Sequence, residues 1–340
     1  MTMARARGPL AEVARVWFGF ALAVCVLMLG AATRIAALIE WLGLITQLQR
    51  EDTCVCLAVL HFRALLFVNP QIRIRLHDMD WDALLAKAPA MVLMNHSSFF
   101  DFFLFTSQIP LAVAYSGHVR TVISASLGKL PILGASMGDH SGSFKVYFSA
   151  KGSGFGKGDK NDFSVDREKQ QVETDRMEQC VTAASHRTHS GRAPWQLAHV
   201  CGALRSGVPT ASRYLVRRSH ISAVQGLIAF CPEGSMNKEP SKGLKPFRRG
   251  SFSQAAKFST PIFGAALHGC TDAWPVDAPI GGYPATVGIS LKKLLVPTAG
   301  ATAAELADAS QASMQAQVAA LELHALRERV LGKSIPLLLV

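Results

Sequence analysis

A histidine and an aspartate stand five positions apart in the apolar segment LMNHSSFFDFF, residues 93–103. A histidine accepts a proton at neutral pH when a carboxylate bound to its other ring nitrogen fixes the tautomer and stabilises the charged ring. His96 and Asp101 could therefore form a general base. Five residues of straight α-helix would place the two side chains about 140° apart, on different faces. We therefore expect His96 to precede the first helical turn and to fold back over it.

The elements around this pair can supply that geometry. Residues 90–94, AMVLM, predict a short buried strand, and residues 97–109 have a helical pattern. His96 would then lie where a strand gives way to a helix, close to the free backbone N–H groups of the helix start. Ser97 and Ser98 can cap that helix.

A second interpretation of the pair requires no catalysis. His96 could be a buried polar residue, and Asp101 could be a first-turn acid that the helix dipole favours. A metal site is not predicted, because two ligands do not make one. The seven cysteines have no repeated spacing, so they predict neither a disulfide framework nor a zinc site.

Short apolar runs separated by helical patterns predict an α/β domain in which helices cover a sheet. In such folds the functional side chains lie at strand ends. The C-terminal part of the chain begins as an alanine-rich helix and finishes in an apolar tail. Besides 90–94, the predicted strands are 72–77, 227–231, 260–267 and 286–296.

The N-terminal part contains a membrane segment by length and composition. Residues 16–33 carry no charge, and Arg34 separates them from a second apolar stretch. Eighteen residues are enough to span, because a bilayer core takes about 20 helical residues. We expect a retained membrane helix or a helical hairpin rather than a signal peptide, since the apolar core is long and lacks a clean cleavage site. Arg5, Arg7 and Arg15 favour a cytosolic N-terminus.

The positive charge of the chain is local. The net charge is +11, and residues 185–219 supply about half of it, with six arginines and no acid. A basic balance attracts phosphate groups. Nucleic acid is not expected as a partner, because no stacking aromatics or recognisable binding motif accompany the arginines. The hydrophobic content of 49% and the charged content of 17% are typical of a protein that lives in or on a membrane.

The histidine motif has companions further along the chain. NHSSFFD at 95–101, followed by CPEGS at 231–235, resembles the 1-acylglycerol-3-phosphate acyltransferase family, glycerolipid acyltransferases with NHxxxxD and PEGS/T motifs. The similar blocks occur in the order of the family and span residues from about 90 to 270. The other matching segments are LGKLPILG at 127–134, SVDREKQ at 164–170, LKPFRRGSF at 244–252 and TPIFGAAL at 260–267.

The resemblance implies a role for each motif. His96 would be the general base on a hydroxyl of the acceptor, Asp101 would orient it, and the hydroxyl would attack an acyl thioester directly. Glu233 would order neighbouring donors, because its own charge repels phosphate. The resemblance implies no metal and no cofactor, with acyl-CoA or acyl-carrier protein as co-substrate and with lysophosphatidate and membrane lipid as partners. The residues implied to bind substrate are Asn95, Ser98, Arg167, Glu233, Gly234 and Ser235.

The resemblance also implies a mixed sheet covered by helices, preceded by the N-terminal membrane helix or helical hairpin, and it suggests a division of the chain. Residues 1–50 would form the membrane anchor, residues 51–300 the acyltransferase domain, and residues 301–340 a C-terminal helix with an apolar tail. Two stretches depart from the family pattern, namely a hairpin-like insertion at about 138–162 and the basic stretch at about 185–222.

The predicted reaction is acyl transfer to the free hydroxyl of lysophosphatidate, which yields phosphatidate. The acceptor could instead be glycerol 3-phosphate or a lysophospholipid. Transacylation between phospholipids is a further alternative. A non-catalytic lipid-binding protein of the same fold is the alternative from another class. We expect an integral or tightly associated membrane protein, at the endoplasmic reticulum by default or at a plastid or bacterial inner membrane.

Overall fold

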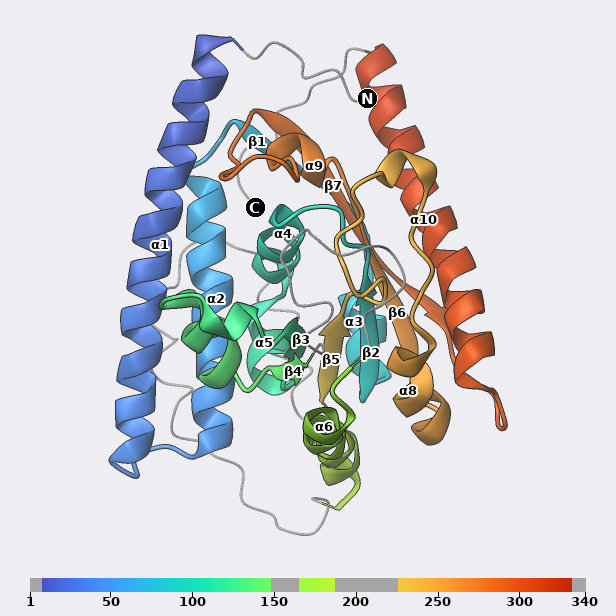
Figure 1. The fold of residues 1–340 in the computed structure, drawn as a ribbon. Coiled ribbons are helices and arrows are strands. Elements are labelled where there is room, and N and C mark those ends of the chain that lie inside the picture. The colour runs from blue at the N-terminus through green and yellow to red at the C-terminus, as the bar shows by residue number, and fades with distance from the viewer. Residues whose placement is uncertain (1–7, 148–164, 187–225, 332–340) are drawn as a thin grey trace.

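The computed structural model describes residues 8–147, 165–186 and 226–331 (Figure 1). Its centre is a seven-stranded sheet in the order β1-β7-β6-β2-β5-β3-β4. Neighbouring strands run parallel except β6 and β7, which pair antiparallel, so the sheet is mixed as predicted. The strands are β1 (Ile72–Met79), β2 (Ala90–Met94), β3 (Arg120–Ser124), β4 (Phe144–Val146), β5 (Leu227–Phe230), β6 (Ile262–His268) and β7 (Ala285–Leu295).

Helices cover both faces of the sheet, which is the α/β class expected from the sequence (Figure 1). Helices α1, α2 and α4 lie on one face, and α8 and α10 lie on the other. The α-helices are α1 (Pro9–Trp41), α2 (Gln47–Phe67), α3 (Trp81–Ala86), α4 (Phe100–Gln108), α5 (Leu111–Ser116), α6 (Arg167–His186), α8 (Ser253–Phe258), α9 (Cys270–Ala273) and α10 (Ala303–Leu331).

Strand β2 shows why the sheet is covered on both sides. All five of its residues are buried, and successive side chains of a strand point to opposite faces. Ala90, Val92 and Met94 pack into the core beneath α2 and α4. Met91 and Leu93 pack into the core beneath α10. A strand with two buried faces reads as an uninterrupted apolar run, which is the pattern in the sequence.

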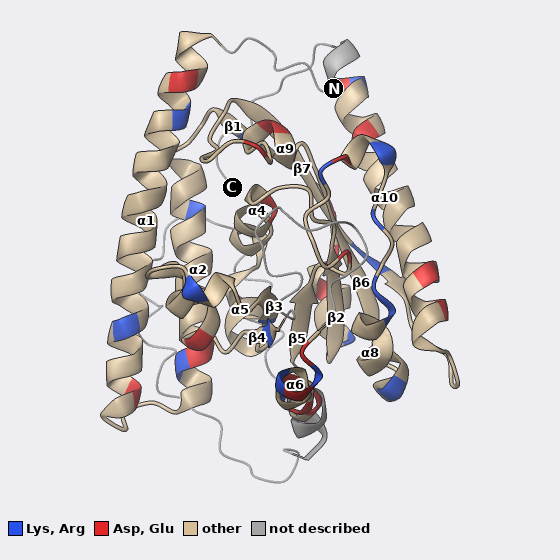
Figure 2. Cartoon of the chain, in the orientation of Figure 1, with Lys and Arg blue, Asp and Glu red and all other residues tan. Residues whose placement is uncertain are grey.

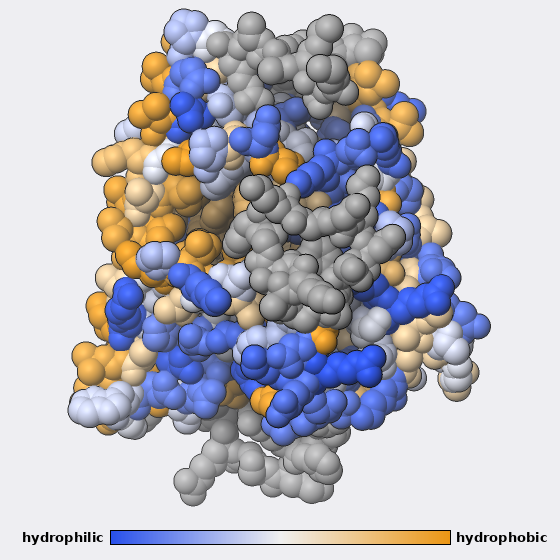
Figure 3. Space-filling model, in the orientation of Figure 1, coloured by the Kyte–Doolittle hydropathy of each residue, from blue (hydrophilic) through white to orange (hydrophobic). Residues whose placement is uncertain are grey.

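The N-terminal part of the chain forms a helical hairpin in which α1 packs along α2. Among the described residues, α1 is the one helix that is long and apolar enough to cross a membrane. Charged residues occur only near its two ends (Figure 2), and apolar side chains gather along its outer side (Figure 3). Helix α2 crosses the predicted boundary between residues 50 and 51, and it packs against α4 and α5, which lie beyond that boundary.

The two predicted insertions fall largely outside the described residues. Residues 187–222 of the basic stretch and residues 148–162 of the first insertion are not described. The segment predicted as part of a hairpin contains β4, which pairs parallel with β3. Helix α10 corresponds to the predicted alanine-rich helix, while the apolar tail from residue 332 onward lies outside the described residues.

Candidate active site

The junction between β2 and α4 brings His96 and Asp101 into contact. His96 follows the strand in an irregular segment, and α4 begins only at Phe100. The His96 Nδ1 atom lies 3.2 Å from the Asp101 Oδ2 atom. The backbone N–H groups of Ser97 and Ser98 donate to the same oxygen at 2.6 and 2.7 Å. The Asp101 side chain therefore points back from the first turn of the helix and contacts His96, five positions earlier in the sequence.

The two members of the pair differ in exposure. The Asp101 side chain is 3% exposed, whereas the His96 side chain is 26% exposed and lines a cavity. A neutral imidazole that donates from Nδ1 leaves Nε2 as a proton acceptor. This geometry would suit a general base, because the carboxylate partner is shielded from solvent while the imidazole borders the cavity.

Glu233 ties this junction to the turn after β5. Its carboxylate is buried and accepts from the backbone N–H of His96 at 2.8 Å and from that of Lys245 at 2.9 Å. Burial raises the pKa of Glu233, and the two backbone hydrogen bonds oppose that rise. Asn237 adds a backbone hydrogen bond to the carbonyl of His96. The position of His96 is thus set by the neighbouring strand end as well as by its own helix.

Two basic residues cover the turn at 232–235. Gly234 has a φ of +67°, and a side chain there would collide with the side chain of Arg248. The Arg248 side chain therefore packs directly over the glycine. Lys245 Nζ donates to the hydroxyl of Ser235 at 2.7 Å. Partial burial lowers the pKa of Arg248, yet a guanidinium keeps its charge in proteins.

Asn95 and Ser98, two of the predicted substrate-binding residues, make contacts within the protein. The Asn95 side chain donates to the carbonyl of Leu267 at 2.9 Å and accepts from the N–H of Leu267 at 2.8 Å, which joins β2 to β6. The Ser98 hydroxyl is fully buried and donates to the carbonyl of Trp274 at 2.6 Å. Asn95 still borders the cavity, whereas Ser98 does not. Both side chains therefore hold the elements around His96 in place: Asn95 joins β2 to β6, and Ser98 joins the start of α4 to the residue after α9.

Arg167, a further predicted substrate-binding residue, lies at a different part of the sheet. It is exposed at the start of α6, where Asp166 N donates to the carbonyl of Tyr147 just after β4. Strand β4 is three strands from β2, about 14 Å at the usual strand spacing. Arg167 is not among the residues that line the cavity beside His96. The structure therefore does not bring it together with His96 and Glu233.

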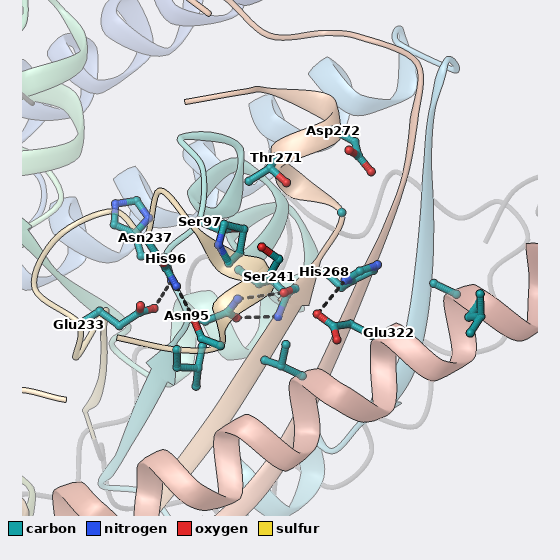
Figure 4. Close-up of a pocket in the computed structure, with 18 residues that line it drawn as sticks. Asn95, His96, Ser97, Glu233, Asn237, Ser241, His268, Thr271, Asp272 and Glu322 are labelled. Carbon is teal, nitrogen blue, oxygen red and sulfur yellow. Dashed lines mark hydrogen bonds and ion pairs between the residues drawn. The ribbon is translucent and has the colours of Figure 1, made fainter. Parts of the chain in front are cut away.

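The cavity beside His96 has a volume of ≈ 380 Å³ (Figure 4). Its other walls come from the end of β6, from α9 and from the C-terminal half of α10. His268 lies at the end of β6, 4.0 Å from the carboxylate of Glu322 on α10. The cavity is lined by Asn95, His96, Ser97, Glu233, Asn237, Pro240, Ser241, Gly243, Leu244, Leu267, His268, Gly269, Thr271, Asp272, Val318, Glu322, Ala325 and Leu326.

Several of these residues were not singled out from the sequence. His268 ends a predicted apolar strand, so the rule that functional side chains lie at strand ends could have found it. Lys245 and Arg248 do not line the cavity but cover the turn at 232–235, and both lie in the segment 244–252 that resembles a family block, where their positive charge is the signal. Glu322 had no local signal, because only the packing of α10 brings it to the cavity. Within the described residues, no group of three or more potential ligands is arranged to hold a metal ion.

A comparison of folds agrees with this architecture. The crystal structure of the 1-acyl-sn-glycerophosphate (LPA) acyltransferase PlsC from Thermotoga maritima is similar, with a TM-score of 0.53 and 13% sequence identity. The similarity covers 92% of this chain and 96% of that chain. No family model and no curated protein matches the sequence. At this identity the comparison establishes the fold: the chain has the fold of a glycerolipid acyltransferase.

Proposed function

We propose that this protein transfers a fatty acyl group from an acyl thioester to the free hydroxyl of lysophosphatidate, making phosphatidate. The observation that carries the proposal is the contact between His96 and the buried Asp101 at the wall of a cavity. The fold is that of a glycerolipid acyltransferase, which supports the same reaction class. A binding protein would have no need of a histidine held by a carboxylate and open to a cavity.

The proposed reaction is a direct transfer. Nε2 of His96 accepts the hydroxyl proton while the hydroxyl oxygen attacks the thioester carbonyl carbon. The tetrahedral intermediate then collapses, the C–S bond breaks, and the thiolate takes the proton from the imidazolium. No acyl-enzyme is needed, because the thioester is already activated. The enzyme's main contribution is to position two amphiphiles beside one base. No cofactor takes part in this scheme, and acyl-CoA or acyl-carrier protein is the donor.

The phosphate of the acceptor would bind near the turn at 232–235. Lys245 and Arg248 place two positive charges over this turn, which Glu233 connects to His96. An arginine suits phosphate because its planar fork pairs with two oxygens. Gly234 and Ser235 belong to this proposed phosphate site. Arg167 stays a second candidate for the same role.

The exposed apolar side of α1 supports membrane association. Large side chains on it are more than half exposed, although α2 covers the opposite side of the helix. An apolar patch of this kind on a protein surface marks an interaction site. We propose that this face contacts lipid, so that the acceptor reaches the cavity from the membrane. The side chains concerned are Leu10, Val13, Val16, Phe20, Leu27, Met28, Ile35 and Leu38.

The test is a His96→Ala variant, assayed with labelled acyl-CoA and lysophosphatidate in phospholipid vesicles. Loss of the base is expected to lower kcat by about a thousandfold. Vesicle binding should be unchanged, because α1 is intact. Activity of His96→Ala close to that of the wild type would contradict the proposal.

Acceptor choice needs a separate assay with purified protein. Lysophosphatidate, glycerol 3-phosphate and a zwitterionic lysophospholipid are offered in parallel with the same donor. We expect the largest kcat/KM for lysophosphatidate, and we expect Arg248→Met to raise KM for that acceptor more than Arg167→Met does. A preference for glycerol 3-phosphate or lysophospholipid would keep the reaction class and change the substrate.

A further inference from the structure

Lys245 and Arg248, the basic residues proposed to bind phosphate, belong to an irregular segment before α8. We call this segment, residues 243–248, the strap. The Lys245 N–H donates to the carboxylate of Glu233 at 2.9 Å. The Arg248 N–H donates to the carbonyl of Pro232, also at 2.9 Å. One side of the strap backbone is therefore bonded to the turn after β5.

The other side of the strap backbone is bonded to helix α10, which passes beside it (Figure 1). The Leu244 N–H donates to the side-chain oxygen of Gln315 at 2.7 Å. The Phe247 N–H donates to the side-chain oxygen of Gln311 at 3.0 Å. The two glutamines are four positions apart, so they lie on the same face of the helix. Pro246 has no N–H, so every backbone donor of the strap from Leu244 onward has a partner.

The side chains of the strap divide in the same way. Leu244 and Phe247 pack into the core that α10 covers. Lys245 and Arg248 lie against the turn instead. A shift of the strap along α10 would therefore move both positive charges relative to the turn.

The strap is also connected to the proposed base. One oxygen of Glu233 accepts from the backbone of His96, and the other accepts from the backbone of Lys245. Asn237 donates its backbone N–H to the carbonyl of His96 and its side-chain amide to the carbonyl of Gly243, the latter at 2.7 Å. A contiguous set of hydrogen bonds thus runs from α10 through the strap to the base, and such sets can carry energetic coupling.

We propose that Gln311 and Gln315 are positioning residues for the acceptor, because their side-chain oxygens fix the strap against α10 and so set where Lys245 and Arg248 meet a phosphate. This inference rests on the proposed function, in which the phosphate of the acceptor binds at these two basic residues. Neither glutamine lines the cavity, so both act through the strap. The position matters because a guanidinium pairs with two phosphate oxygens only in a defined orientation.

The test uses Gln311→Met and Gln315→Met, which keep the length of the side chain and remove the acceptor oxygen. Acyl transfer is measured with full-length protein in phospholipid vesicles. Each variant should raise KM for lysophosphatidate by about fivefold, in line with the loss of one hydrogen bond. KM for acyl-CoA, kcat and vesicle binding should stay at the values of the wild type, because only acceptor binding is weakened. An unchanged KM for lysophosphatidate in both variants would overturn the inference.

Gln317→Met is the matched control. Gln317 lies on the same helix, but its amide donates to the carbonyl of Gly264 on β6 and to Ser290 on β7 rather than bonding the strap. The variant should leave KM for lysophosphatidate unchanged, whatever it does to stability. A rise in KM equal to that of the two strap variants would show a general effect of damaging α10 and would overturn the inference.

A double-mutant cycle tests whether the glutamine acts through the arginine. Gln311→Met is combined with Arg248→Met, and KM for lysophosphatidate is compared with that of Arg248→Met alone. Residues in one hydrogen-bonded network are not additive, so the added substitution should change KM by less than about twofold. A full additive increase in the combined variant would mean that Gln311 does not position Arg248.

Amide hydrogen exchange of the strap separates this inference from the proposed function, because it requires no activity. Exchange at Leu244 should accelerate by about tenfold in Gln315→Met, and exchange at Phe247 should do so in Gln311→Met. Unchanged exchange at both amides would overturn the positioning role, whether or not the protein is an acyltransferase. Full activity in His96→Ala would instead overturn the proposed function.

Discussion

Two histidine–aspartate pairs in this protein have similar contacts and different surroundings. His96 Nδ1 lies 3.2 Å from Asp101, and His118 Nδ1 lies 2.5 Å from Asp52. Both carboxylates are buried. One pair borders the cavity after β2, and the other joins α2 to the start of β3. A histidine–aspartate contact is therefore not a sign of catalysis by itself.

The difference lies in access and in how the negative charge is balanced. The His118 side chain is 11% exposed, against 26% for His96. Asp52 also accepts from the guanidinium of Arg120, which is buried and pairs with Glu51 as well. Asp101 instead receives two backbone N–H groups and a hydroxyl along with its histidine. The guanidinium of Arg120 already balances the negative charge of Asp52. For Asp101 the balancing positive charge would be the imidazolium of His96 itself.

Asp101→Asn should produce the largest effect. An asparagine can keep the backbone contacts but cannot stabilise the charged ring, so kcat should fall by about a thousandfold, or about 4 kcal/mol of activation free energy. The measurement is acyl transfer in vesicles. The matched variant is Asp52→Asn, which should lower stability and leave the kcat of the folded protein near that of the wild type. Equal losses of kcat in Asp101→Asn and Asp52→Asn would contradict the view that only the His96–Asp101 pair takes part in catalysis.

Arg120→Met should affect stability and not catalysis. It leaves Glu51 and Asp52 buried beside His118 without the guanidinium, and breaking a buried ion pair in this way costs about 3 kcal/mol. Denaturant unfolding measures the free energy of unfolding, and an assay normalised to folded protein measures kcat. A stable variant with a large loss of kcat would show that this network serves the site directly.

Glu233→Gln should have an intermediate effect on activity. The glutamine has one acceptor oxygen where the carboxylate uses two, so either His96 N or Lys245 N loses its partner. We expect kcat to fall by about tenfold, in line with one poorly satisfied buried hydrogen bond. Since the acceptor would bind at the turn beside Lys245, KM for lysophosphatidate should rise too. Unchanged kinetics would mean that the turn does not hold the site in place.

His77 should give the smallest effect, seen in the pH dependence of stability. Its ring lies 5.0 Å from that of His324, between β1 and α10. Burial, followed by the charge of His324, lowers the pKa of His77 below its usual 6.5. A lowered histidine pKa contributes stability above the unfolded value and loses it as pH falls through the folded value. Between about pH 7 and about pH 5, His77→Gln should therefore lose less stability than the wild type. A steeper loss in the variant would contradict this sign.

Local patterns in the sequence were sufficient for the elements around the site. The apolar run at 90–94 became β2, the helical pattern after it became α4, and the five-residue spacing required the fold-back that joins His96 to Asp101. Strand and helix periods act over a few residues, so they can be read from a single segment. The apolar N-terminal helix could be predicted for the same reason, whereas the mixed sheet was implied by the resemblance of the motifs and not by any single segment.

Tertiary structure decided which side chains share the cavity. The sheet order places β6 and β5 on either side of β2, and this brings His268 and Glu233 to the cavity beside the proposed base. It also leaves Arg167 three strands away and uses Asn95 to hold two strands together. The sequence by itself determined a candidate base and the strand and helix that position it. Its neighbours depend on contacts between segments up to 176 positions apart, about which no local pattern carries information.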